Sequence, residues 1–186
     1  MGSLSNLSYL YLASNKLSGI LPIWFGDIVN LGYLDLSDNQ FTGEIPTSYS
    51  NLIHLSYLNL SSNLLTGSIP AWFDNLTWLE ELYLNSNQFS GNIPPELGNL
   101  TGLSILNLRN NTLVGDVPAS FTQLDALCGP NHPWHPCYRD YGLDLGYNFL
   151  NVPAPEPPAA FLDLNDPDWH LTQGMSLQIY LPLVNR

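Results

Sequence analysis

The sequence predicts an α/β repeat solenoid in which short parallel strands form one continuous sheet on a concave face. Three observations predict this class. A leucine-containing segment recurs every 24 residues, beginning at Leu7, Leu31, Leu55, Leu79 and Leu103. Within each copy, leucines alternate with other residues, which is the period of a short strand with one buried face. Apolar residues make up 45% of the 186 residues, enough for a core shared between coils.

Each repeat reads LxxLxLxxNx(L/F)xG and continues into an apolar residue followed by proline. A single unit cannot bury its apolar side alone, so the units are expected to stack into a solenoid. The glycines permit a turn, and the prolines predict an extended segment on the outer side. One asparagine per repeat is expected to point inward and to hydrogen-bond the backbone of the next coil. These asparagines are Asn15, Asn39, Asn63, Asn87 and Asn111.

The repeats end irregularly. After five regular copies, a cysteine-containing insertion at 128–140 interrupts the period, and the strand motif resumes at Leu143 as one irregular repeat. We therefore expect a solenoid over 1–153 and a Pro-rich segment, C-terminal cap and tail over 154–186. Leu4 occupies the position of Ile28 and Leu52, so the solenoid begins in the middle of a repeat. This predicts a fragment of a longer repeat array.

Charge and motif content exclude several classes of function. The chain has 16 acidic and 4 basic residues, a net charge of −12, so it lacks the basic surface that nucleic-acid binding requires. It contains neither a run of about 18 apolar residues nor a signal peptide, so membrane insertion is not expected. Nucleophile-elbow, zinc-protease, dinucleotide and P-loop motifs are missing. We expect no enzyme activity, no cofactor and no metal.

The repeat pattern LxxLxLxxNxLxGxIP resembles the plant-type leucine-rich repeat of receptor ectodomains and polygalacturonase-inhibiting proteins, over roughly residues 4 to 153. The end of the chain is similar to secreted bacterial proteins that carry such repeats, on the motifs Leu143–Leu150 and Asp166-Pro167-Asp168-Trp169. The resemblance implies a right-handed horseshoe segment, secreted or at the cell surface.

Cys128 and Cys137 allow three interpretations. Cys-Gly-Pro followed by a later cysteine resembles the cysteine pair after the repeats of plant receptors, which implies a disulfide that would stabilise the fold by about 2.5–3 kcal/mol. Alternatively, the two cysteines with His132 and His135 would bind zinc, although their spacing matches no common zinc site. A thiolate paired with histidine is the third possibility. We expect the disulfide.

The outward residues of the strands form columns across the concave face. Tyr9, Tyr33 and Tyr57 are expected to make a ridge roughly 10 Å long, because neighbouring strands are about 4.8 Å apart. Tyrosine with short polar residues is typical of adaptable binding surfaces, although tyrosine also favours strands for packing reasons. The predicted ligand-binding residues are Tyr9, Tyr11, Tyr33, Asp35, Tyr57, Asn59, Glu81, Tyr83, Asn107 and Arg109.

These observations predict a non-catalytic recognition module that binds a peptide, protein or glycan on its concave face. The acidic balance favours a neutral or basic ligand. The alternative is a structural spacer segment of a larger surface or adhesion protein, with no ligand of its own.

Overall fold

The computed structural model describes residues 4, 6–127 and 142–151. Cys128, His132, His135 and Cys137 lie outside these ranges, as does the predicted boundary between 153 and 154. The disulfide, its zinc and thiolate alternatives and the C-terminal domain therefore stay predictions. None of the helices in the described part is long and apolar enough to cross a lipid bilayer.

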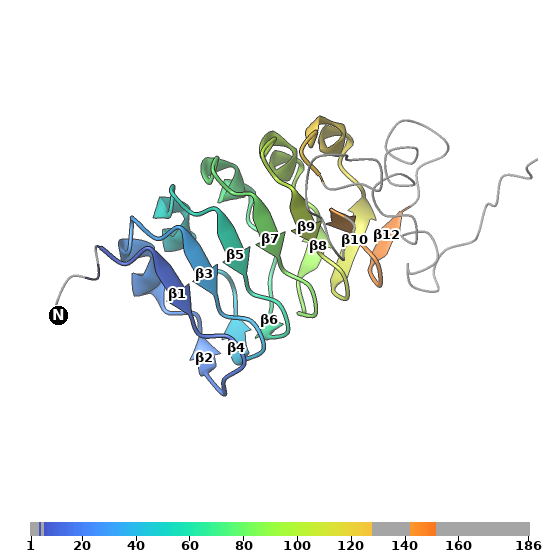
Figure 1. Cartoon of the computed structure of the whole chain (residues 1–186). Helices are drawn as coiled ribbons and strands as arrows, with labels where there is room; N and C mark the ends of the chain where they lie inside the picture. The colour runs from blue at the N-terminus through green and yellow to red at the C-terminus, as the bar shows by residue number, and fades with distance from the viewer. Residues whose placement is uncertain (1–3, 5, 128–141, 152–186) are drawn as a thin grey trace, which may run out of the picture.

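A six-stranded parallel sheet runs the length of the solenoid (Figure 1). Consecutive coils each contribute one strand. In the five regular coils residues 24 apart are partners in the register, for example Tyr9 with Tyr33 and Leu58 with Leu82, whereas Leu106 pairs with Leu143 of the irregular coil. The sequence prediction of a parallel sheet is confirmed. Its strands, in spatial order, are β1 (Tyr9–Tyr11), β3 (Tyr33–Asp35), β5 (Tyr57–Asn59), β7 (Glu81–Tyr83), β9 (Ile105–Asn107) and β11 (Leu143–Asp144).

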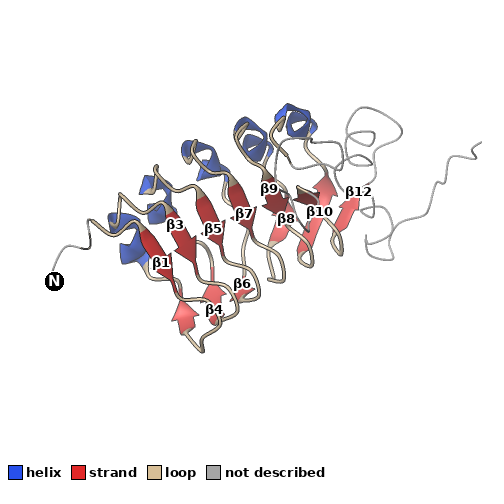
Figure 2. Ribbon diagram, viewed as in Figure 1, coloured by secondary structure: helices blue, strands red, loops and turns tan. Residues whose placement is uncertain are grey.

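Two three-stranded parallel sheets follow the asparagine turns, on another side of the solenoid (Figure 2). In the first of them, partners are 22 residues apart, as in Ser18 with Gln40. From the sequence we expected turns here, because glycines such as Gly19 and Gly91 hide the strand pattern. These strands are β2 (Ser18–Ile20), β4 (Gln40–Gly43) and β6 (Leu64–Leu65), then β8 (Ser90–Asn92), β10 (Thr112–Asp116) and β12 (Phe149–Asn151).

Short 3-10 helices follow the repeat prolines, where the sequence analysis predicted an extended segment. That prediction holds only for the proline itself: Pro22 is extended, with φ −63° and ψ 117°, and its carbonyl accepts a hydrogen bond from the Phe25 N–H. The fixed φ of proline suits a helix start, so one helical turn follows. The helices are η1 (Ile23–Asp27), η2 (Thr47–Asn51), η3 (Ala71–Asn75), η4 (Pro95–Asn99) and η5 (Ala119–Gln123).

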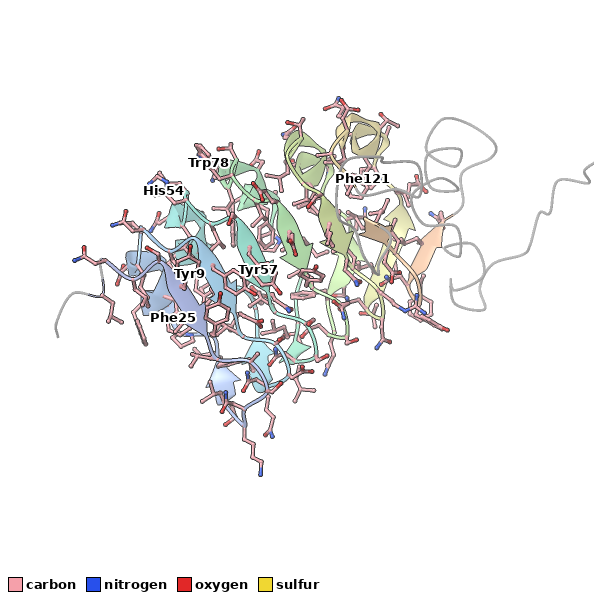
Figure 3. All side chains as sticks on the ribbon, viewed as in Figure 1. Tyr9, Phe25, His54, Tyr57, Trp78 and Phe121 are labelled. Atoms are coloured by element: carbon pink, nitrogen blue, oxygen red, sulfur yellow. The ribbon has the colours of Figure 1, made fainter. Side chains whose placement is uncertain are left out.

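The core runs continuously between the sheets and the helices. Leu34, Leu58, Leu82 and Leu106, one per coil, are completely buried. An aromatic residue or leucine from each helix closes the other side of the core; Phe25 and Phe121 are labelled in Figure 3. In the first coil the equivalent Leu10 is only partly buried.

The repeated asparagines are buried in the middle coils, as predicted. Asn63 is 6% exposed; its Oδ1 accepts from the Phe41 N–H at 3.0 Å, and its Nδ2 donates to the Leu36 carbonyl at 3.0 Å. Both partners belong to the preceding coil, so the expectation of bonds to the next coil was wrong. Asn15 is exposed, and its Nδ2 bonds only carbonyls of its own turn.

Glycine and serine bring two pairs of helices into close approach. A Cβ on Gly26 of η1 would collide with the Ser48 carbonyl of η2, and a Cβ on Gly98 of η4 would meet the Ser120 Cβ of η5 at 2.5 Å. In both pairs the serine hydroxyl donates to a carbonyl of the preceding helix, from Ser48 to Ile23 at 2.6 Å and from Ser120 to Pro95 at 2.7 Å.

Candidate functional site

The ten predicted binding residues all lie along the six-stranded sheet. Side chains alternate along each strand, so the leucine in the middle of a strand is buried and its two neighbours face outward. Arg109 follows β9 by two residues, and the other nine lie within strands. In Figure 3, Tyr9 and Tyr57 lie on the outward face of this sheet. The predicted placement is therefore correct, whereas binding itself is a proposal.

Five tyrosines from four adjacent strands are in contact, and we call Tyr9, Tyr11, Tyr33, Tyr57 and Tyr83 the tyrosine cluster. The rings of Tyr33 and Tyr57 are stacked, with centroids 3.9 Å apart and an interplanar angle of 4°. Tyr11 lies 4.4 Å from Tyr33, and Tyr83 lies 5.6 Å from Tyr57. Tyr9 and Tyr11 on the edge strand remain 64% and 60% exposed. The cluster is an aromatic platform whose most exposed side chains lie on β1.

Hydrogen bonds between side chains fix the tyrosine hydroxyls. The Tyr33 hydroxyl bonds that of Tyr57, which also accepts from Asn59 Nδ2 at 3.2 Å. The Tyr83 hydroxyl donates to Glu81 Oε2 at 2.9 Å. Burial is the largest cause that raises the pKa of Tyr33, followed by its hydrogen bond to Tyr57 and by nearby groups including Asp35. Burial also raises the pKa of Tyr57. Both hydroxyls therefore keep their protons to a higher pH than an ordinary tyrosine does.

Asp35, Asn59, Asn107 and Asp144 occupy equivalent strand positions and share a structural task. In each, Oδ1 accepts from the backbone N–H two residues later, at 3.0–3.1 Å. Asp35 and Asn59 also accept from the hydroxyls of Ser37 and Ser61, both at 2.7 Å. These bonds form Asx turns, which end the strand. Both bonds to Asp35 use Oδ1, so its Oδ2 keeps lone pairs for a further donor.

Arg109 belongs to a separate group at the other end of the sheet. Its Nη1 lies 3.4 Å from Asp144 Oδ1, and its guanidinium lies 4.3 Å from the ring centroid of Tyr147. Tyr147 was not among the predicted binding residues, because it follows the irregular insertion. Tyr147 adopts φ +53°, as do Ser14, Asp38, Ser62, Ser86 and Asn110 at φ +53° to +57°. These six equivalent residues therefore share a left-handed turn conformation, and in Tyr147 this turn positions the ring against Arg109.

A family model for the leucine-rich repeat region matches residues 1–124. The chain belongs to the leucine-rich repeat family. A search of curated proteins by sequence gives no match. The family model and the structural comparisons confirm the expected resemblance to plant-type leucine-rich repeats.

Solved structures of plant leucine-rich repeat proteins share this fold. The Arabidopsis receptor kinase HAESA, in complex with the peptide hormone IDA and the co-receptor SERK1, is 34% identical with a TM-score of 0.72, over 84% of this chain and 24% of that chain. The plant peptide hormone receptor RGFR1 in complex with RGF2 is 36% identical with a TM-score of 0.68, over 80% and 22%. The BIR2 ectodomain from Arabidopsis thaliana is 36% identical with a TM-score of 0.59, over 60% and 59%. The chain spans about a quarter of the two hormone receptors.

Proposed function

We infer that this leucine-rich repeat segment is a non-catalytic recognition module that binds a peptide or protein ligand, neutral or basic, across the tyrosine cluster. The observation that carries the inference is the cluster itself: five contacting rings on the outward side of four strands, with two of them more than half exposed. Tyrosine supplies large contact area at low conformational-entropy cost, and the flanking Ser, Asn and Asp supply adaptable hydrogen bonds.

Several similarities support a peptide ligand outside the cell. Two of the similar receptors were solved in complex with peptide hormones, and a third similar structure is the BIR2 ectodomain. The platform is long enough for a peptide, because four neighbouring strands about 4.8 Å apart span roughly 15 Å. A glycan ligand is the other candidate, since exposed aromatic rings also stack on sugar rings.

Binding to displayed ligands tests the proposal. The purified protein is exposed to a displayed random-peptide library and to a glycan array, beside a variant with Tyr33→Ala, Tyr57→Ala and Tyr83→Ala. The matched control carries Gln40→Ala and Gln88→Ala, two exposed residues away from the cluster. We expect peptides retained by the wild type and the control and lost by the tyrosine variant. Equal retention by all three proteins would refute binding at the tyrosine cluster, and retention by none of them would favour the spacer alternative.

A further inference from the structure

We propose that the tyrosine cluster and Asp35 form a subsite for an arginine side chain of the bound peptide. This inference rests on the proposed function and names the ligand chemistry at one end of the platform. Asp35 is the register partner of Tyr11 and lies next to Tyr33 and Tyr57 in space. A carboxylate beside aromatic faces is an environment that attracts a cation, through both ion pairing and the ring quadrupole.

Asp35 has no basic partner in the part of the chain that the structure describes. The basic residues there are Lys16 and Arg109, and the one ion pair found among them joins Arg109 to Asp144. Glu81 adds a second carboxylate on the same face, where it accepts from the Tyr83 hydroxyl. The platform is therefore negatively charged and aromatic, which complements a cationic side chain.

The chain itself shows how such a subsite holds a guanidinium. Asp144 occupies the same strand position as Asp35. Its Oδ1 accepts from the Gly146 N–H, as Asp35 Oδ1 accepts from the Ser37 N–H. Asp144 Oδ1 also lies 3.4 Å from Arg109 Nη1. The Tyr147 ring completes that site, 4.3 Å from the guanidinium. This arrangement combines a carboxylate of one coil, an arginine of the preceding coil and an aromatic face.

Ala13 replaces the arginine at the equivalent position beside Asp35. Asn107 is the register partner of Asp144, and Arg109 comes two residues after Asn107. In the same way, Tyr11 is the register partner of Asp35, and Ala13 comes two residues after Tyr11. Ala13 has only a methyl group where the other end of the sheet has an arginine side chain. In this coil Asp38 occupies the position of Tyr147, so Tyr11 and Tyr33, whose ring centroids are 4.4 Å apart, supply the aromatic surface instead. An arginine from a ligand can then take the place that Arg109 takes beside Asp144.

Arginine fits this subsite better than lysine does. Its planar guanidinium stacks on a tyrosine ring and offers several N–H donors in fixed directions, whereas the lysine ammonium is a compact and strongly hydrated point charge. Asp35 Oδ2 and the ring of Tyr11, a residue that is 60% exposed, match a planar donor group. The subsite therefore selects arginine over both lysine and a neutral residue of the same shape.

Titration with small probes tests the subsite directly. The probes are N-acetyl-arginine amide, its lysine counterpart and N-acetyl-citrulline amide, which keeps the shape of arginine without its charge. Binding is followed by the NMR signals of the tyrosine rings. We expect the arginine probe to shift the signals of Tyr11 and Tyr33 and to bind about tenfold more tightly than the citrulline probe, with the difference shrinking at high salt.

Two substitutions at the subsite separate charge from folding. Asp35→Asn should fold, because Asn59 makes the same two bonds to Ser61 with an amide oxygen, and it should abolish the preference for arginine over citrulline. Asp27→Asn, on an exposed helix residue, removes the same charge elsewhere and should keep the preference. Ala13→Arg should fill the subsite from within and block the arginine probe, whereas Ala13→Gln should block it less.

The outcomes distinguish this proposal from the broader one. If displayed peptides bind in a tyrosine-dependent way but Asp35→Asn and Ala13→Arg leave their affinity unchanged, the arginine subsite is wrong and the recognition function stands. Equal affinity for the arginine and citrulline probes would also overturn the subsite. An arginine preference that Asp35→Asn removes, seen together with arginine-rich selected peptides, would support both.

Discussion

Replacing Asn63 by alanine should lower the unfolding free energy of the solenoid more than the same change at Asn15. Asn63 is 6% exposed, and its amide bonds two coils at once: Oδ1 accepts from the Phe41 N–H, while Nδ2 donates to the carbonyls of Leu36, Leu60 and Ser61 at 3.0–3.2 Å. Asn15 is exposed and bonds only two carbonyls of its own turn. It therefore serves as a matched control at the same repeat position.

The expected cost follows from these contacts. An amide nitrogen has two N–H groups, so the three contacts of Nδ2 count as two hydrogen bonds, and the bond from Phe41 makes three. At about 1 kcal/mol net for each bond, Asn63→Ala should cost about 3 kcal/mol of unfolding free energy. Asn15→Ala, at an exposed site, should cost no more than about 1 kcal/mol. With a urea slope of about 2 kcal/mol/M, the midpoint of the Asn63 variant should fall by about 1.5 M.

Urea unfolding measures the free energy, and amide hydrogen exchange tests its cause. In the Asn63 variant the Phe41 amide loses its acceptor and should exchange faster, whereas the Phe89 amide, bonded at 3.0 Å to Asn111 Oδ1, should keep its protection. A cost for Asn63→Ala no larger than that for Asn15→Ala would refute the reasoning. Unchanged exchange of the Phe41 amide would do the same.

Three further substitutions test other parts of the structure. The Tyr49 hydroxyl is buried without a hydrogen-bond partner among the described residues, so Tyr49→Phe should raise the unfolding free energy by about 1 kcal/mol. Burial raises the Tyr49 pKa above its usual 10.0, so the folded state keeps a proton that the unfolded state loses, and the stability of the wild type falls as pH rises above 10. The phenylalanine variant should therefore lose less stability between pH 8 and pH 11. Urea midpoints at the two pH values would show this difference. Gly26→Ala should lower the unfolding free energy by about 1–3 kcal/mol, because the added Cβ collides with the Ser48 carbonyl. Ser50→Ala, at the same position one coil later, should change thermal stability little. Equal melting temperatures for the two variants would argue against the collision. Arg109→Ala should cost about 1 kcal/mol, since the side chain is partly exposed, and a double-mutant cycle with Asp144→Ala should show coupling that decreases with salt.

Much of the fold could be predicted because the 24-residue period repeats without a gap over five copies. The buried leucines and the asparagine positions depend only on that period and on side-chain alternation. The three-stranded sheets could not be predicted, because glycines such as Gly19, at φ +90°, interrupt the strand pattern. The 3-10 helices were also missed, since one turn after a proline is too short to show a helical period.

The candidate site was predictable in its placement and not in its interactions. The columns placed the tyrosines on one face, because residues two apart in a strand point the same way. The stacking of Tyr33 on Tyr57 depends on side-chain rotamers that sequence does not reveal. The pairing of Arg109 with Asp144 spans 35 residues, and the insertion before Leu143 removes the period that would have indicated it.

The glycine–serine contacts between helices have a consequence for the shape of the horseshoe. Strand spacing on the inner sheet is fixed by backbone hydrogen bonds, so curvature depends on how far apart the helices on the outer side are held. Glycine faces serine between η1 and η2 and between η4 and η5, where the helices pack closely; η2 and η3 lack this pair and pack less closely, whereas η3 packs closely against η4 without it. Exchanging these small residues, which lie away from the tyrosine cluster, should change the spacing of the helices and offers a way to reshape the face of the sheet without altering any residue on it.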